Sequence, residues 1–447
     1  MSGCEILLSD AAAAIDAGLV GSDVKFTGVS TDSRAVQAGQ LFVALRGPNF
    51  DAHDFAENVR EAGAAALLVD HELDCSLPQL VAQDTLLALG QLAAYWRSQL
   101  SLPVVAVTGS NGKTTVKEIL ASVFSRLGET LATKGNLNNH IGVPLTLLSI
   151  NKQHKAAVIE MGANNPNEIS YLTNMARPNV AMINNAAAAH LEGFGSLEGV
   201  AKAKGEIYQG LDKDGVAIVN ADDQFAPLWR DLAKHNKTLS FGLQEPADVT
   251  CEWQGDINGN RLNIRTPVGE FDCTLKLLGR HNVMNALAAT AVAVAANVNL
   301  QTIADGIGAL QAVPGRLQLK PGVNGARVID DTYNANPNSL RAGLDVLASC
   351  EGEKFLVLGD MGELGENSIE LHQQAGADAA RLNIDRIFTL GGFSEEATEA
   401  FGENGQHFED VDELVNAIVP ILSKDATVLV KGSRMMRMER VVQALLA

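Results

Sequence analysis

The sequence predicts an α/β protein of three domains, of which the central and C-terminal domains are built around parallel sheets. Near-continuous apolar runs alternate with helical patterns in the middle of the chain and again near its end. Such runs are typical of parallel strands that are buried on both faces, with helices covering the sheet. The pattern breaks at "AVPGRLQ", so the second series of strands predicts a separate domain.

Bulk composition excludes several classes of protein. The 447 residues leave room for several cores, and 46% hydrophobic with 19% charged residues is ordinary for a globular protein. A net charge of −19 argues against a general nucleic-acid binder, which needs a basic surface. No apolar run approaches the ~20 residues that cross a bilayer, and the N-terminal stretch has no basic segment typical of a signal peptide. The five scattered cysteines form no C-x-x-C pair, so we expect reduced thiols, a cytoplasmic protein and no membrane insertion.

The first domain is expected over residues 1–83. Short apolar strands in "LFVAL" and "AALLVD" flank the helical stretch "DFAENVREAG", which predicts a small α/β unit. The next stretch, "LPQLVAQDTLLALGQLAAYWRSQL", predicts a strand and a long helix that leads into the second domain.

The second and third domains are expected over residues 84–313 and 314–447. Strands are predicted in "PVVAVTG", "AAVIEMG", "NVAMINN" and "GVAIVNADD", followed by the alanine-rich helix "HNVMNALAATAVAVAANV". The series restarts with "ARVIDDTYNANP", "KFLVLGDMG", "RIFTLGG" and "ATVLVKGSR", which predicts a Rossmann-like doubly wound unit. The glycines of "LGDMGELG" have the wrong spacing for a dinucleotide fingerprint, so they give little support to an NAD site.

The string "TGSNGKTT", between an apolar strand and a helix, predicts a phosphate-binding loop. Gly109 and Gly112 allow several backbone N–H groups to face one anion, and the helix beginning at Lys113 adds its dipole. Lys113 supplies a charge for the β and γ phosphates, and the Thr114 hydroxyl suits Mg²⁺. The loop departs from the usual motif because Val107 stands where a glycine is expected.

Further polar groups follow the predicted central strands. Glu160 ends "AAVIE", and the carboxyl ends of parallel strands face the ligand crevice, so its carboxylate could lie beside the magnesium. His190 also follows a strand, but by itself it is as consistent with a structural histidine as with a ligand. Helical spacing alone predicts that Lys202 and Lys204 face solvent.

Two basic residues, Lys431 and Arg434, follow the last predicted strand, where they either meet an anionic substrate or cap the strand end. No G-x-S-x-G string indicates covalent acyl chemistry. The residues by themselves therefore indicate a magnesium-dependent, ATP-using α/β enzyme and leave its substrate open.

These strings together resemble the Mur ligase family, the ATP-dependent amino-acid and peptide ligases of peptidoglycan synthesis, over essentially the whole chain. "STDSRAVQAGQLFVALRG" and "FDAHDF" resemble the family's uridine-nucleotide-binding first domain. "TKGNLNNHIGVPLTLL", "NAAAAHLEGFGSLEGVAKAKGEI", "DDTYNANPNS" and "LGDMGELGENS" resemble the member that adds D-alanyl-D-alanine. The D-N-P-R string typical of the diaminopimelate-adding member does not occur.

The resemblance implies ligation of D-alanyl-D-alanine to UDP-N-acetylmuramoyl-tripeptide through an acyl phosphate, with ATP and two Mg²⁺ ions, by a monomer. Within the superfamily, the alternatives are a diaminopimelate- or lysine-adding ligase and a folylpolyglutamate synthase. An alternative of another class is a nucleotide-switched binding module without chemistry.

The resemblance also implies roles for individual residues. Those expected to be catalytic are Lys113, Glu160, His190 and Lys204. The metal ligands are expected to be Thr114, Glu160, His190 and Lys204, a lysine often carbamylated in the family. The residues expected at ATP are Gly109, Ser110, Asn111, Gly112, Lys113, Thr114, Thr115, Asn282, Asn285, Arg316 and Asp331. The uridine-diphosphate loop would contain Ser30, Asp32, Ser33 and Arg34, and the acceptor peptide would face Asn138 and Asn139. Tyr333 stands where some relatives carry a lysine.

Overall fold

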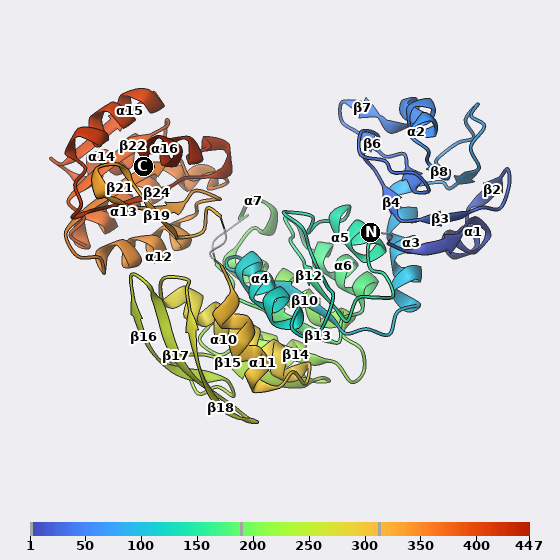
Figure 1. Ribbon diagram of the computed structural model, residues 1–447, viewed down its shortest axis with the longest axis horizontal. Helices are drawn as coiled ribbons and strands as arrows, with labels where there is room; N and C mark the ends of the chain where they lie inside the picture. Colours follow the sequence, from blue (N-terminus) through green and yellow to red (C-terminus); the bar gives the residue numbers. More distant parts are fainter. Residues whose placement is uncertain (1–2, 188–190, 312–313) are drawn as a thin grey trace.

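Three α/β units follow one another in the computed structural model, which describes residues 3–187, 191–311 and 314–447. The blue N-terminal unit and the orange-to-red C-terminal unit lie at opposite ends of the molecule, with the central unit between them (Figure 1). In the described ranges, no helix is both long enough and apolar enough for a membrane crossing.

The first unit contains a five-stranded sheet in the order β2-β9-β8-β5-β4. Strands β4 (Val29–Ser30), β5 (Leu41–Val43), β8 (Ala66–Val69) and β9 (Gln79–Val81) are parallel, and β2 (Gly18–Val20) is antiparallel to β9. The 3-10 helix η1 (Ala52–Phe55) and α2 (Ala56–Glu61) connect β5 to β8, as the sequence predicts. The smaller elements are α1 (Leu8–Ile15), β1 (Glu5–Leu7) paired with β3 (Lys25–Thr27), and β6 (Arg46–Gly47) paired with β7 (Phe50–Asp51).

The long helix α3 (Thr85–Ser98) joins the first unit to the second. Its N-terminus is capped by the Asp84 carboxylate, which accepts hydrogen bonds from the first backbone N–H groups. The Trp96 indole donates to the Ile150 carbonyl at 2.8 Å, and Arg97 Nε donates to the Ala176 carbonyl at 2.8 Å. The helix is thus fastened to the layer that covers one face of the central sheet.

The central sheet has six parallel strands in the order β11-β12-β10-β13-β14-β15. They are β10 (Val104–Thr108), β11 (Thr130–Ala132), β12 (Ala156–Glu160), β13 (Val180–Ile183), β14 (Val216–Asn220) and β15 (Lys237–Phe241). One face packs against α4 (Lys113–Phe124), α10 (Arg280–Ala295) and α11 (Leu300–Ala309). The other packs against α3, α5 (Gly142–Leu148), α6 (Glu168–Ala176) and α8 (Leu197–Gly205). The short elements are α7 (Leu191–Phe194), η2 (Glu206–Gly210) and α9 (Ala226–Leu232).

A three-stranded antiparallel sheet in the central unit was not predicted. It comprises β16 (Thr250–Asp256), β17 (Gly259–Thr266) and β18 (Gly269–Leu275). Most of β16 and β18 is exposed or half-buried, so these strands lack the continuous apolar runs that mark the parallel ones.

The third unit has a six-stranded sheet in the order β19-β20-β24-β21-β22-β23, parallel except for β19 at one edge. Its strands are β19 (Gln318–Pro321), β20 (Arg327–Asp331), β21 (Glu353–Gly359), β22 (Arg386–Leu390), β23 (Gly405–Phe408) and β24 (Ala426–Lys431). The helices are α12 (Pro337–Ala348), α13 (Ser368–Arg381), α14 (Glu395–Phe401), α15 (Val411–Ile418) and α16 (Glu439–Leu445). Separate apolar clusters lie on the two faces of the sheet, which confirms the predicted doubly wound unit.

Candidate active site

The phosphate loop lies between β10 and α4, at the carboxyl edge of the central sheet. Gly112 has a φ of 79°, and a Cβ there would collide with the side chains of Asn184 and Asn285. The Asn111 backbone N–H donates to Asn185 Oδ1 at 2.8 Å and so fixes the loop against the end of β13. Val107, the departure from the usual motif, is a fully buried strand residue, so the loop begins only after β10 ends.

Lys113, the first residue of α4, folds back over this loop. Its Nζ donates to the Gly109 carbonyl at 2.6 Å and to the Ser110 carbonyl at 3.3 Å. Burial lowers the pKa of Lys113, and the Glu160 carboxylate opposes that shift. The ammonium is therefore held at the loop by neutral carbonyl acceptors, and an anionic phosphate would compete with them for it.

Glu160 ends β12 and is only 2% exposed. Its Oε1 accepts a hydrogen bond from Asn138 Nδ2 at 2.8 Å, while its Oε2 is buried without a hydrogen-bond partner among the described residues. An unpartnered buried carboxylate oxygen is costly unless a cation meets it, and oxygen ligands are those that Mg²⁺ prefers. Glu160 and the Thr114 hydroxyl line the same cavity, so the residues present fit a magnesium ion.

Lys204 lies on α8 and is 3% exposed, so the prediction from helical spacing that it faces solvent is wrong. Burial lowers its pKa well below the ordinary value, and the positive charge of Lys113 adds to the effect. Lys202 is exposed as expected and pairs with Glu198 at 2.7 Å. His190, the other expected metal ligand, lies outside the described residues.

Asparagine side chains form a chain of hydrogen bonds behind the phosphate loop. Asn184 Nδ2 donates to Asn285 Oδ1 at 2.8 Å, and Asn285 Nδ2 donates to Asn282 Oδ1 at 3.0 Å. Asn282 in turn donates to the Leu278 carbonyl at 2.8 Å. Asn282 and Asn285 are among the residues expected at ATP, whereas Asn184 was not predicted, since its only signal is its position directly after β13.

The third unit reaches the phosphate loop through two side chains. Arg316 Nη2 donates to Thr114 Oγ1 at 3.2 Å, and its guanidinium carbon lies 4.2 Å from the centre of the Tyr333 ring. Asn336 Nδ2 donates to Asn111 Oδ1 at 2.8 Å. Arg316 Nε is buried without a hydrogen-bond partner among the described residues, so the guanidinium keeps a donor for a ligand. Asn336, which also caps α12, was not predicted from the sequence.

Asp331 and Lys431 end the neighbouring strands β20 and β24 and form a buried ion pair. Lys431 Nζ lies 2.6 Å from Asp331 Oδ2 and also donates to the Asn334 carbonyl at 2.9 Å. Lys431 is one of the two residues that could contact an anionic substrate, and in the structure its charge is paired with Asp331. Arg434 is exposed and pairs with Glu439 at 3.4 Å.

A cavity of about 580 Å³ lies between the central and third units. It is lined by loop residues from Ser110 to Thr115 and by Asn138, Glu160, Asn282, Asn285, Arg316, Asp331, Tyr333, Lys431 and Arg434. A second cavity of about 570 Å³ shares Asn111, Gly112, His281 and Asn285 with it and extends to Trp253 and Met284. The polar cavity suits phosphates, and the adjoining one offers aromatic and apolar surface for a base.

The remaining expected residues lie away from these cavities. Ser30 is the half-buried last residue of β4, and the loop that follows contains Ser33 and the exposed pair Asp32 and Arg34, which lie 2.9 Å apart. Asn139 Oδ1 accepts from the backbone N–H groups of Ile141 and Gly142 at 3.2 and 2.9 Å, at the start of α5. The two adjacent asparagines therefore have different contacts: Asn138 bonds to Glu160, whereas Asn139 bonds to the backbone at the start of α5.

A phosphate loop that faces a doubly wound third unit across a cavity defines a multidomain nucleotide-dependent enzyme. Family models described as "Mur ligase family, catalytic domain", "Mur ligase middle domain" and "Mur ligase, glutamate ligase domain" match residues 25–97, 107–293 and 315–434. The chain belongs to the Mur ligase family.

Individual relatives are similar over the whole chain. The UDP-N-acetylmuramoyl-tripeptide–D-alanyl-D-alanine ligase of Escherichia coli (strain K12) is 45% identical, with 98% of each chain covered. A crystal structure of MurF from Acinetobacter baumannii matches with a TM-score of 0.94 and 39% identity over 99% of each chain. The MurF ligase of Thermotoga maritima in complex with ADP matches with a TM-score of 0.83 and 28% identity, covering 93% of this chain and 96% of that one.

Proposed function

We propose that this Mur ligase joins D-alanyl-D-alanine to UDP-N-acetylmuramoyl-tripeptide, with conversion of ATP to ADP and phosphate, in peptidoglycan synthesis. The observation that carries the substrate assignment is 45% identity, over 98% of both chains, to the E. coli ligase of that name. The phosphate loop and the buried unpartnered oxygen of Glu160 support the use of a magnesium nucleotide. This assignment is preferred to the diaminopimelate- or lysine-adding and folate-linked alternatives.

In the first step, an oxygen of the acceptor's terminal carboxylate attacks the γ-phosphorus of ATP. The bond from that phosphorus to the β–γ bridging oxygen breaks, ADP leaves, and an acyl phosphate forms. The loop N–H groups and Lys113 bind the phosphates, with the lysine exchanging loop carbonyls for phosphate oxygens. Thr114 and Glu160 would hold one magnesium ion, with His190 and Lys204 proposed for a second, and the bound ions would supply positive charge against the transferring group.

In the second step, the neutral amine of D-alanyl-D-alanine attacks the acyl carbonyl. The tetrahedral intermediate expels phosphate as the C–O bond breaks, and the amine gives up a proton, leaving the amide. Water would hydrolyse the acyl phosphate, so the cavity must close during turnover. Arg316 and Asn336 already contact the phosphate loop from the third unit, which makes them the side chains that would follow such a closure.

Lys204 is proposed to work as a carbamate. A neutral amine is the form that adds carbon dioxide, and burial next to Lys113 favours the neutral form of Lys204. Carbamylation would replace a buried neutral amine by an oxygen ligand for magnesium and a partner for the Lys113 charge.

The test is phosphate release with ATP, Mg²⁺ and UDP-N-acetylmuramoyl-tripeptide, followed by the mass of the acceptor. Release should depend on D-alanyl-D-alanine, with a matching mass gain, and should not occur with L-alanine. Lys204→Ala should abolish it, whereas Lys202→Ala, a change of an exposed lysine on the same helix, should leave it intact. Release that depends on a single amino acid or a folate would overturn the substrate assignment.

A further inference from the structure

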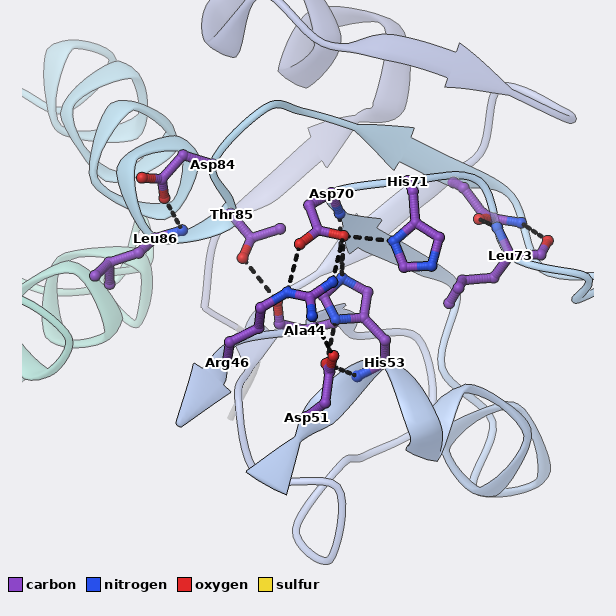
Figure 2. A network of polar contacts seen from close by, with 11 residues as sticks. Ala44, Arg46, Asp51, His53, Asp70, His71, Leu73, Asp84, Thr85 and Leu86 are labelled. Carbon is purple, nitrogen blue, oxygen red and sulfur yellow. Dashed lines mark hydrogen bonds and ion pairs between the residues drawn. The ribbon is translucent and has the colours of Figure 1, made fainter. Parts of the chain in front are cut away.

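A cluster of five polar side chains in the first unit lies outside the site described above. Figure 2 shows Arg46, Asp51, His53, Asp70 and His71 directed toward one another. Asp70 and His71 come directly after β8, whereas His53 belongs to η1. One ligand atom from each of His53, Asp70 and His71 can be chosen so that all three lie within 4.8 Å of one another. We propose that these three residues form a binding site for a zinc-class divalent metal ion.

The hydrogen bonds of His53 fix which of its two ring nitrogens has the lone pair that a metal ion would bind. Its Nδ1 lies 2.5 Å from Asp51 Oδ1, and a carboxylate only accepts, so Nδ1 carries the proton. The Asp70 backbone N–H points at Nε2 at 3.2 Å, which requires a lone pair there. A histidine ligand whose other nitrogen donates to a carboxylate is the usual arrangement in metal sites, because the carboxylate orients the ring and raises its basicity.

This lone pair faces another acceptor. His53 Nε2 lies 3.2 Å from Asp70 Oδ1, and neither atom carries a proton to place between them. A protonated Nε2 would donate to Asp70 Oδ1, but its hydrogen would then oppose the hydrogen of the Asp70 backbone N–H. A metal ion resolves the conflict, since it accepts electrons from both atoms. It would replace the hydrogen bond from the Asp70 backbone N–H to His53 Nε2 and the contact of His71 Nδ1 with Asp70 Oδ1, an oxygen that also accepts from Arg46 Nη2 at 3.2 Å.

Distances in the cluster suit a tetrahedral ion with little movement. Ligand atoms about 2.0–2.1 Å from zinc lie roughly 3.3 Å from one another in a tetrahedron. The His53–Asp70 separation of 3.2 Å already matches this value. His71 Nδ1 lies 2.5 Å from Asp70 Oδ1 and must withdraw by about 0.8 Å, which a side chain that is 55% exposed can do by rotating.

The charges favour a cation, and the ligand types favour zinc. Asp51 and Asp70 share a single guanidinium, that of Arg46, at 2.6 and 2.7 Å. With neutral imidazoles the cluster therefore carries a net charge of −1, which opposes binding of an anion. Two imidazole nitrogens and one carboxylate oxygen suit zinc, whereas magnesium prefers oxygen ligands alone. Bound metal would fasten η1 to the end of β8.

The experiment compares the EDTA-treated full-length chain with His71→Ala and, as a matched control, His235→Ala, which removes an exposed imidazole elsewhere. Each protein is titrated with zinc chloride without nucleotide, and then with cobalt chloride as a spectroscopic probe. We expect the wild-type chain and His235→Ala to bind one more equivalent than His71→Ala, with the intense visible absorption of tetrahedral cobalt. Asp51→Asn should weaken binding about 10- to 100-fold.

Thermal unfolding provides a second readout that does not depend on activity. Zinc should raise the unfolding temperature of the wild-type chain and of His235→Ala, but not that of His71→Ala. Equal metal binding by the wild-type chain and His71→Ala, or none by either, would overturn the proposal and leave the cluster as an ion-pair network only.

Discussion

Replacing Asn138 by alanine should weaken magnesium binding rather than acceptor binding. The side chain donates to Glu160 Oε1 at 2.8 Å, and Glu160 is 2% exposed. Its removal would leave both carboxylate oxygens without a hydrogen-bond partner among the described residues and free the carboxylate to turn. A hydrogen bond to a charged group contributes about 1.5–3 kcal/mol, and loss of a residue that orients a metal ligand typically costs about 10–100-fold in affinity.

The assay is phosphate release as a function of Mg²⁺ concentration, together with the thermal shift caused by Mg²⁺ and ADP. For Asn138→Ala, we expect the Mg²⁺ concentration at half-maximal rate to rise about 10–100-fold, with a smaller change in kcat at saturating Mg²⁺. Asn139→Ala is the matched control, since its side chain accepts from backbone N–H groups at the start of α5. It should cost about 1 kcal/mol of stability and leave the Mg²⁺ dependence unchanged. An unchanged Mg²⁺ dependence in Asn138→Ala, with a raised KM for the UDP-linked acceptor, would show that Asn138 serves the acceptor and not the metal site.

Three further predictions concern the third unit and the helix beside it. Arg316→Ala should raise the KM for ATP and lower turnover by about 10–100-fold in kcat/KM, because a charge-assisted hydrogen bond is lost; unchanged steady-state kinetics would contradict the proposed contact with nucleotide. Lys431→Met should destabilise the third unit by about 3–5 kcal/mol in denaturant unfolding, since Asp331 would be left buried and unpaired, and adding Asp331→Asn should recover most of the loss. If the double variant is no more stable than the single, the ion pair is not the cause. Burial lowers the pKa of His281 from 6.5 to about 4, so the unfolded chain takes up a proton between these values that the native chain does not. The contribution of this residue is complete above pH 6.5 and is lost as the pH falls toward 4. Because His281 is only half-buried, we expect this pKa difference to contribute about 2 kcal/mol to the free energy of unfolding. His281→Gln should reduce by that amount the stability lost between pH 6.5 and pH 4.

Much of the fold was predictable because buried parallel strands are marked by continuous apolar runs. Strands β10, β12, β13 and β14, and the corresponding series in the third unit, all lie where such runs occur. The antiparallel sheet β16–β18 has no such mark because its outer strands are largely exposed. Edge strand β11 is only three residues long and half-buried, so it too lacks the signal.

The candidate site was predictable where one local string contains the chemistry. The phosphate loop and Glu160 are of this kind, since each follows an apolar strand directly. Lys204 was misjudged from spacing because the position of a residue along a helix does not say which faces neighbouring elements cover. The pairing of Lys431 with Asp331 depends on β20 lying beside β24, although the two residues are 100 positions apart. Local sequence patterns do not predict which strands lie side by side in a sheet.

In the proposed reaction, ATP serves to activate the acceptor's carboxylate. The most direct measurement uses UDP-N-acetylmuramoyl-tripeptide labelled with ¹⁸O in its terminal carboxylate, with ATP, Mg²⁺ and D-alanyl-D-alanine. An acyl phosphate requires one carboxylate oxygen to bond to phosphorus and to leave with it when the amide forms. Each released phosphate should therefore carry one ¹⁸O from the acceptor. Amide formation with unlabelled phosphate would contradict it.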